Sequence, residues 1–345
     1  MLAALRTRRA EDMVAGYIFL TPSVLILAVF IFIPILLALY VSFHTWSPAS
    51  QVGLANAPFV GLENYARQIS TSSIERTNFY RAVKNNLYYV LGVVPTQTFL
   101  ALLLAVIVNQ KFLKGRTFFR TAFYFPSITS SAAISLIFLY MYQSNGLINQ
   151  VLDRVIPGYT PFNWIADPQL GATGLIHLVL RQFGLTIRTA GDWATTQALG
   201  LTLWDWISGP SVAMTAIMLL NIWTTLGTLM LIYLAALQDV PGYVYEAAAI
   251  DGASNSDMFW KITVPLLRPT TLFVVTVGII GTWQIFDQVY VMSAGGPQNT
   301  TLTLAFLIWT RMRDFSTGLA AALAFILFGI IMLFTLIQRR ITAER

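Results

Sequence analysis

Stretches without charged residues dominate this sequence, and each is long enough to cross a lipid bilayer as a helix. About 20 helical residues span the ~30 Å hydrocarbon core of a membrane. Six windows reach that length, and only the fifth contains a formal charge, Asp287: Tyr17–Phe43, Leu87–Val108, Thr121–Met141, Val212–Leu237, Thr271–Met292 and Leu319–Ile337. They lack the period-2 alternation of barrel strands, and helices are the other way to satisfy the backbone in lipid. The sequence therefore predicts an all-α membrane protein with six transmembrane helices.

The composition agrees with this interpretation and excludes several classes of protein. Only 10% of the 345 residues are charged, whereas soluble domains carry about 25%. A soluble enzyme, a nucleic-acid-binding protein and a disordered chain are therefore poor fits. There is no cysteine and only two histidines, His44 and His177, so we expect no disulfide and no metal site. The phosphate-binding loop, the metalloprotease motif and the serine-hydrolase motif are missing too, so we expect no catalytic residue and no cofactor in this chain.

Basic residues set the predicted orientation. The short segment between the second and third windows carries Lys111, Lys114, Arg116 and Arg120. Short cytoplasmic loops are enriched in such residues, which makes both termini cytoplasmic. The net charge of +6 then reflects the loops of a membrane protein, and no nucleic-acid partner is expected.

The windows divide the chain into a tail, a first helix and a core. We expect a cytoplasmic tail at 1–16, the first transmembrane helix at 17–43, an outer loop at 44–86 and a five-helix core at 87–340. Within the core, we expect an enlarged outer insertion at about 142–211, between the third and fourth helices, and a cytoplasmic loop at about 238–268.

One part of the outer insertion leaves two structures open. Gly171–Ile187 is apolar but short, and it carries a histidine and an arginine. A helix lying on the membrane surface fits this pattern, and a turn packed on the outer face is the alternative. Two additional transmembrane spans fit it less well, because the segment is too short.

The cytoplasmic loop has the most unusual sequence. Alanine-rich Tyr243–Ile250 favours a helix, and Gly252 ends it. A second short helix can follow, with Ser254 or Asn255 as its N-cap. The small side chains of the first helix, flanked by Phe259, would allow close docking into a groove of a partner protein. An amphipathic linker resting on lipid head groups is the alternative.

The same loop carries a resemblance to a known family. Its matching residues, at the family's spacing, are Glu246, Ala247, Ala248, Gly252, Ile262 and Pro265. With these residues it resembles the loop shared by the permease subunits of binding-protein-dependent ABC importers. Tyr245–Ala253 and Ser293–Pro297 look like the sugar-importer branch, which includes the large permease subunit of the maltose transporter. The resemblance covers about Tyr17–Arg340, apart from Leu170–Trp204, which looks inserted.

The resemblance implies partners, a location and a role for the loop. The chain would be the permease of an ATP-driven importer in a bacterial or archaeal inner membrane, taking up a sugar or oligosaccharide from an external solute-binding protein. Its other partners would be a second, homologous permease in a heterodimer and two ABC ATPase subunits, which bind the ATP and Mg. The loop would be the coupling helix, and Glu246 would pair with a basic group of the ATPase. The residues assigned to it are Glu246, Ala247, Ala248, Asp251, Gly252, Phe259, Ile262 and Pro265.

Polar residues in the fourth and fifth windows predict a substrate pathway. Polar side chains are costly in lipid, so they tend to face a cavity or another helix. Aromatic rings with hydrogen-bonding neighbours suit a sugar. Hydrogen bonding across a packed helix interface is the alternative. Residue chemistry selects Asn221, Thr224, Thr225, Thr228, Thr282, Trp283, Gln284, Asp287 and Tyr290, and the resemblance adds Gly278, Gly281 and Ile285.

Three other functions are compatible with apolar helices. A permease for glycerol phosphate or another phosphorylated solute would need Arg or Lys in its cavity, and no window contains either. A secondary carrier would show inverted repeats or broken, charged helices. A lipid-modifying membrane enzyme would need a catalytic cluster. A neutral, hydroxyl-rich solute is therefore the expected substrate.

Overall fold

The computed structural model describes residues 2–49, 52–71, 73–110, 113–184, 186 and 191–343, and these are mostly helical. Five of the described helical stretches are long and apolar enough to cross a membrane, and a bent pair of helices makes a sixth. The predicted all-α membrane fold is therefore confirmed. The exception is a two-stranded antiparallel hairpin, β1 (Gln197–Ala198) and β2 (Leu201–Thr202), which lies in the predicted outer insertion.

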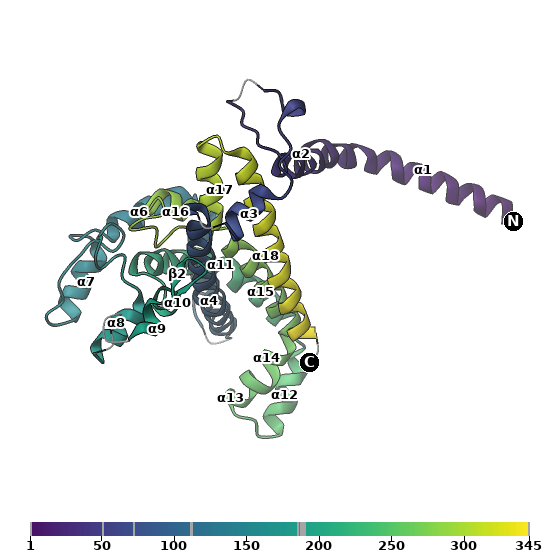
Figure 1. Ribbon diagram of the computed structural model, residues 1–345. Helices are drawn as coiled ribbons and strands as arrows, with labels where there is room; N and C mark the ends of the chain where they lie inside the picture. The colour runs from purple at the N-terminus through teal and green to yellow at the C-terminus, as the bar shows by residue number, and fades with distance from the viewer. Residues whose placement is uncertain are drawn as a thin grey trace.

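Four long helices build the bundle (Figure 1). They are α4 (Ile74–Asn109), α11 (Val212–Gln238), α15 (Arg268–Trp283) and α18 (Thr317–Ala343). The central helix α4 packs against both α11 and α15. One buried cluster gathers around Tyr89, Val93 and Ile217, and a second lies further along α4 around Ala105 and Tyr233.

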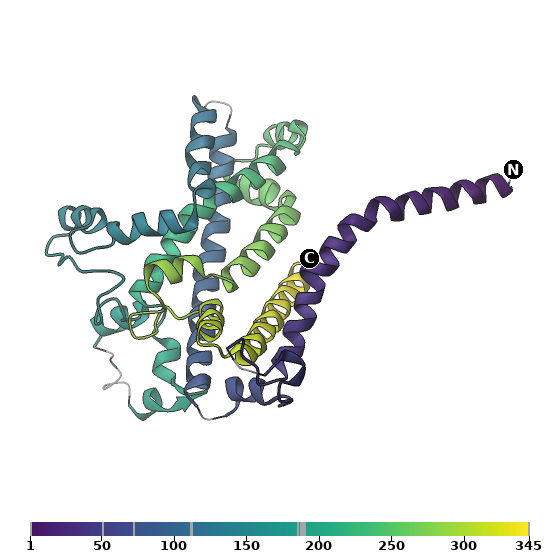
Figure 2. The same cartoon turned by 90° about the horizontal axis from the view of Figure 1, so that it is seen from above.

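The N-terminal helices leave the bundle as an arm. α1 (Leu2–Leu27), a π-helical turn η1 (Ala28–Phe32) and α2 (Ile33–Ser42) follow one another, with a transmembrane stretch at Met13–Ser42. Only α2 packs against α18, and α1 projects away from the rest of the chain (Figures 1 and 2).

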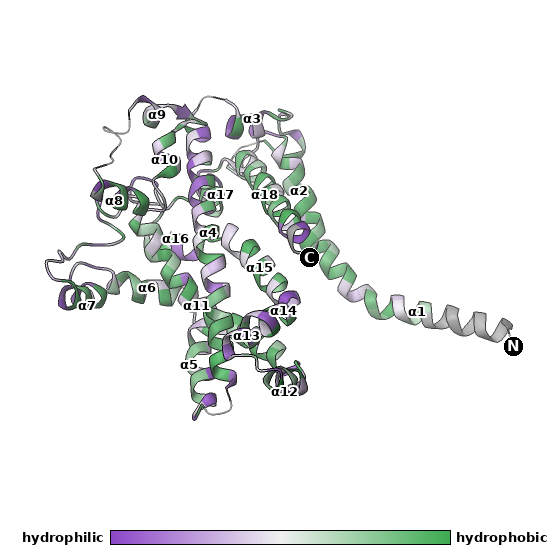
Figure 3. Cartoon of the chain, turned by 90° about the horizontal axis from the view of Figure 1, so that it is seen from below, coloured by the Kyte–Doolittle hydropathy of each residue, from purple (hydrophilic) through white to green (hydrophobic). Residues whose placement is uncertain are grey.

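Short elements occupy the two ends of α4 (Figure 3). One end, here called the α12 end, carries α12 (Gly242–Ile250), α13 (Asn255–Asp257), the π-helix η3 (Met258–Thr263) and α14 (Val264–Leu266). The opposite end, here called the α10 end, carries η2 (Leu54–Asn56), α3 (Glu63–Ile69), α8 (Leu175–Gln182), α9 (Asp192–Thr195), α10 (Leu203–Ile207) and the hairpin. The remaining short helices are α7 (Leu147–Val155), α16 (Asp287–Met292) and α17 (Leu304–Arg313).

The third window differs from the prediction, because it is not one continuous helix. α5 (Arg116–Ile128) and α6 (Ser131–Met141) meet at 98°. The backbone of Thr129 is extended, so α5 ends at Ile128 and its last carbonyl groups have no N–H of a continuing helix to accept from. Side-chain hydroxyl groups donate to carbonyls near this end of the helix. Ser127 Oγ donates to Tyr124 O at 2.7 Å, and Thr129 Oγ1 donates to Phe125 O at 3.1 Å. The hydropathy of the window predicts its apolar length. It does not predict that Ser and Thr side chains bond to backbone carbonyls in place of the helical N–H groups.

Candidate functional site

The fifth window is also interrupted, between α15 and α16. The break at 284–286 frees backbone carbonyls that lipid could not satisfy. Asn86 Nδ2 donates to Thr282 O and Trp283 O at 3.4 and 3.2 Å, and Thr303 Oγ1 donates to Ile285 O at 3.1 Å. Asn86 Oδ1 also accepts from Leu304 N at 2.8 Å. Side chains outside the fifth window therefore stabilise the break.

We expect Asn86→Leu to destabilise the folded chain by about 3 kcal/mol, because it leaves two buried carbonyls and one buried N–H without a partner. Thermal unfolding of the purified protein in detergent checks this. Gln288→Leu is the matched control, since Gln288 lies beside the break in α16 and makes no hydrogen bond within the described residues. Equal melting temperatures for the two variants would contradict the assignment.

Several predicted pathway residues make contacts at helix interfaces. Thr225 Oγ1 donates to Gln97 Oε1 at 2.9 Å, which joins α11 to α4. Gln97 is almost fully buried, and its Nε2 lies where a Cβ on Gly278 would come within 2.8 Å. Gly278 thus makes room for Gln97. Gln97 was not a candidate, although it is the single amide of the second window and stands out there as a polar residue.

Other candidates are buried or satisfied by their own helix. Thr282 is buried and donates to Gly278 O at 2.7 Å. Trp283 is buried against Phe334, with ring centroids 5.1 Å apart. Thr224 donates to Asn221 O at 2.9 Å, and both residues are half-buried.

A second group of candidates remains exposed on the surface of the chain. It comprises Thr228, Gly281, Gln284, Asp287 and Tyr290. Nothing lies within 4 Å of a Cβ built on Gly281. Ile285, between these residues, is buried. Apart from Thr228 on α11, the exposed polar groups of this set lie around the break between α15 and α16.

Aromatic rings lie beside the break. Tyr290 stacks on Phe286 with centroids 5.4 Å apart and meets Trp309 edge-on at 4.8 Å. The second break also lies near, because α6 packs against α16. Both bent spans therefore meet in the part of the bundle where an exposed carboxylate, an amide and aromatic rings come together.

At the α12 end, the structure contains the predicted helix–turn–helix. α12 ends before Gly252, whose positive φ of 78° places it in the left-handed region that favours glycine. Ser254 caps the next helix: its Oγ accepts from Asp257 N at 3.1 Å. Tyr245 OH and Thr263 Oγ1 lie 3.1 Å apart and connect α12 to η3.

Asp257 stabilises this turn. Its carboxylate lies 2.5 Å from Lys261 Nζ. The hydrogen bonds from Lys261 and Ser254 lower the pKa of Asp257 from 3.8 to about 2. A depressed carboxyl pKa stabilises the folded turn fully above pH 3.8, and this contribution is lost as the pH falls through about 2.

One face of α12 is exposed and apolar. Tyr243, Ala247 and Ile250 recur at helical spacing, and Ile250 is 87% exposed. Glu246 lies on the same exposed side and makes no hydrogen bond or ion pair with the described part of the chain. Ala248 is only partly exposed, and Asp251 is exposed in the turn.

The remaining loop candidates face the bundle or the start of α15. Phe259 packs against the cluster around Ala105 and Tyr233, so it does not contribute to the exposed face. Its neighbour Trp260, which the sequence did not single out, is 58% exposed. Ile262 is half-buried, and Pro265 lies in the first turn of α14.

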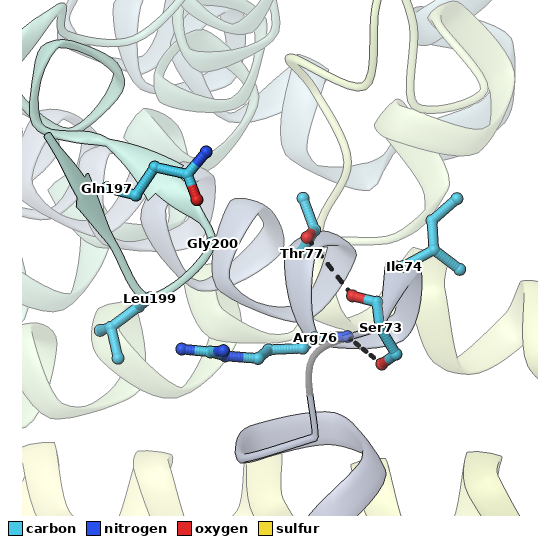
Figure 4. A pocket seen from close by; sticks show the side chains of 7 residues that line it. All are labelled: Ser73, Ile74, Arg76, Thr77, Gln197, Leu199 and Gly200. Carbon is cyan, nitrogen blue, oxygen red and sulfur yellow. Dashed lines mark hydrogen bonds between the residues drawn. The ribbon is translucent and has the colours of Figure 1, made fainter. Parts of the chain in front are cut away.

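An open depression of about 520 Å³ lies at the α10 end (Figure 4). It lies between the first turn of α4, at Ser73, Arg76 and Thr77, and the hairpin, at Gln197 and Gly200. Gly200 has a φ of 84°, and a Cβ there would lie 3.2 Å from Thr77 Oγ1. The hairpin therefore rests closely on the first turn of α4.

Comparison with known proteins assigns the chain to a family. The sequence profile described as "binding-protein-dependent transport system inner membrane component" matches residues 75–344. The chain belongs to this family. The matched range of this binding-protein-dependent transport component includes α12 and both broken spans, whereas the N-terminal arm lies before it.

Named relatives extend over nearly the whole chain. The chain is 29% identical to the arabinooligosaccharides transport system permease protein of Bacillus subtilis (strain 168), over 96% of this chain and 89% of that protein. It is 28% identical to the lactose transport system permease protein of Rhizobium radiobacter, over 96% and 95% of the two chains. It is also 28% identical to the trehalose/maltose transport system permease protein of Thermococcus litoralis, over 94% and 92%.

A solved structure shares the fold. The chain superposes with a TM-score of 0.72 on a chain from the crystal structure of a bacterial ABC transporter involved in the import of the acidic polysaccharide alginate. The match covers 99% of both chains at 18% identity. The predicted ABC-importer permease fold is therefore confirmed.

Proposed function

We propose that this chain is the permease subunit of an ATP-driven importer for a sugar or oligosaccharide. The observation that carries this proposal is the exposed polar group at the break between α15 and α16, formed by Gln284, Asp287 and Tyr290. Polar and charged groups at membrane depth avoid lipid and face a water-filled pathway. An amide and a carboxylate can bind hydroxyl groups, and an aromatic ring can stack on the apolar face of a sugar. The relatives named for arabinooligosaccharides, lactose and trehalose/maltose support the same substrate class.

A second permease would complete this pathway. The exposed polar groups and the nearby face of α15, with Val277 and Gly281, are open on the surface of one chain. The N-terminal arm is another surface for such a partner, because almost none of its transmembrane stretch is buried within this chain. The second subunit would cover the break and enclose the solute between two similar halves.

Two ATPase subunits, which would hold the ATP and Mg, would supply the energy. The exposed face of α12 would enter a groove of one of them, with Tyr243, Ala247 and Ile250 as its apolar surface and Glu246 as its charge. η3 and α14 connect this face to α15, so movement of α12 would reach the break. The chain itself would catalyse no reaction. The α12 end would be cytoplasmic and the α10 end would face the external solute-binding protein.

Reconstitution tests the proposal. The chain is co-expressed with the ATPase, second-permease and binding-protein genes that neighbour its own, and the complex is placed in lipid vesicles. We expect ATP hydrolysis to rise when the binding protein carries a neutral oligosaccharide, with uptake of that sugar into the vesicles. Glycerol phosphate and amino acids serve as control solutes. Stimulation by these solutes and not by any sugar would contradict the proposal.

A further inference from the structure

A buried lysine that makes no hydrogen bond or ion pair with the described residues lies in α4 at the α10 end. Lys84 is only 9% exposed. Within the described part of the chain, its ammonium makes no hydrogen bond and no ion pair. A buried charge is costly unless an opposite charge offsets it, and a lysine stem is flexible enough to reach water where water is near. The position of Lys84 is therefore unusual for a residue that only supports the fold.

Lys84 faces a small cavity of about 160 Å³. Four segments that are distant in sequence form its walls, and one of them, with Ala172 and Gly174, precedes α8. Arg81 and Lys84 come from α4, Asp205 and Ser208 from α10 and its last turn, and Gln298 and Thr300 from the segment between α16 and α17.

The charges in this cavity do not balance. Arg81 lies one helical turn before Lys84 and likewise has no hydrogen bond or ion pair among the described residues. The single acidic group of the wall, Asp205, is engaged as a cap: its Oδ2 accepts from Thr202 N at 3.0 Å and from Thr202 Oγ1 at 2.8 Å. The wall therefore carries two cationic side chains that make no hydrogen bond among the described residues, and one carboxylate, Asp205, whose charge acts on Lys84 and leaves an excess of one positive charge.

The uncharged groups are also occupied. Gln298 Nε2 donates to Pro168 O at 2.9 Å, Thr300 Oγ1 to Pro297 O at 2.7 Å and Ser208 Oγ to Asp205 O at 3.0 Å. The first of these bonds links the segment between α16 and α17 to Pro168, and the other two lie within single segments. Arg81 and Lys84 are the two charged donors of the wall that make no hydrogen bond among the described residues, and two adjacent cations select an anion such as a carboxylate.

We propose that this cavity receives an Asp or Glu side chain of the external solute-binding protein, whose carboxylate pairs with Lys84 and Arg81. The proposal rests on the proposed function, which places the α10 end toward that protein. The cavity is smaller than the about 300–1,000 Å³ of small-molecule sites, so it suits one carboxylate side chain better than an oligosaccharide. A second depression of about 390 Å³, lined by His177 and Trp204, shares Asp205, Ser208 and Gln298 with it. This depression gives the rest of a docked protein surface a place beside the cavity.

The test measures how strongly the binding protein activates the reconstituted importer. In the complete complex in lipid nanodiscs, ATP hydrolysis is titrated with sugar-loaded binding protein. We expect Lys84→Met to raise the half-saturating concentration at least about tenfold, because it leaves the incoming carboxylate with only one of its two cationic partners. The maximal rate stays unchanged, since the variant does not touch α12 or the broken spans. Lys114→Met, an exposed lysine near the opposite end of α4, is the matched control and leaves the half-saturating concentration unchanged.

Two further measurements distinguish docking from a structural role. The melting temperature of Lys84→Met stays equal to that of the wild type or rises, because a buried charge has been removed. Exposed carboxylates of the binding protein are neutralised one at a time, and one of them produces the same tenfold rise with the wild type and no further rise with Lys84→Met. Arg81→Gln, at a half-exposed position, repeats the experiment should Lys84→Met fail to fold.

An unchanged half-saturating concentration in both Lys84→Met and Arg81→Gln would overturn the proposal. Loss of the second permease from the purified Lys84→Met complex would overturn it too, because the cavity would then hold a segment of that subunit. A wild-type complex that no sugar-loaded binding protein stimulates would overturn the proposed function itself, and this result differs from the first two because it precedes any substitution.

Discussion

Glu246→Ala is expected to uncouple ATP hydrolysis from the binding protein while leaving the fold intact. Glu246 is exposed on α12 and has no partner within the described chain, so its removal changes the free energy of unfolding by no more than about 0.5 kcal/mol. In the proposed complex the same carboxylate becomes buried against a basic group of the ATPase. Removal of one member of a buried charge pair costs at least about 2 kcal/mol, which corresponds to roughly a 30-fold loss of coupling.

The measurement compares binding-protein-stimulated ATP hydrolysis and sugar uptake in the same vesicles. Asp239→Ala is the matched control, because Asp239 is also an exposed carboxylate at the α12 end and lies outside α12. It should behave as the wild type in both assays. If the binding protein stimulates ATP hydrolysis normally in a normally assembled Glu246→Ala complex, Glu246 is not part of the coupling surface.

The pattern of residues in the sequence was sufficient to predict those elements whose structure depends on one physical rule. The fourth window, Val212–Leu237, differs from α11 by a single residue at its end, because nothing in its apolar run competes with helix formation. The turn after α12 was equally predictable, since Gly252 and the Ser254 cap act through local backbone geometry. The family followed from residues of the same loop, whose spacing is visible in the sequence alone.

The breaks in the spans and the packing of the polar residues were not predictable in the same way. Hydropathy starts the second span at Leu87, but α4 begins at Ile74, because charged residues outside the membrane do not stop a helix. Asn86 was therefore assigned to a loop, whereas it satisfies the break between α15 and α16. Thr225 was selected for its hydroxyl group and Gly278 from the resemblance, yet their position beside Gln97 depends on contacts between helices that are distant in sequence.

Gly227→Ala is expected to force α11 and α5 apart. A Cβ at Gly227 would lie 2.0 Å from the carbonyl oxygen of Phe123 and 2.7 Å from the Cα of Tyr124. These are backbone atoms of α5, so no side-chain rotation can relieve the overlap and the two helices must separate. Small residues permit such close contact between membrane helices, and overpacking costs about 1–3 kcal/mol.

Gly329→Ala provides the matched control, because Gly329 also lies inside a transmembrane helix and a Cβ there meets nothing within 4 Å. We expect a lower melting temperature for Gly227→Ala only, measured by thermal unfolding in detergent. α5 leads into α6, and α6 packs against α16 beside the exposed polar groups. A displaced α5 should therefore also reduce sugar uptake in vesicles, even at temperatures where the variant remains folded. Equal melting temperatures with normal uptake would show that the close contact between α11 and α5 is not required for the folded transporter.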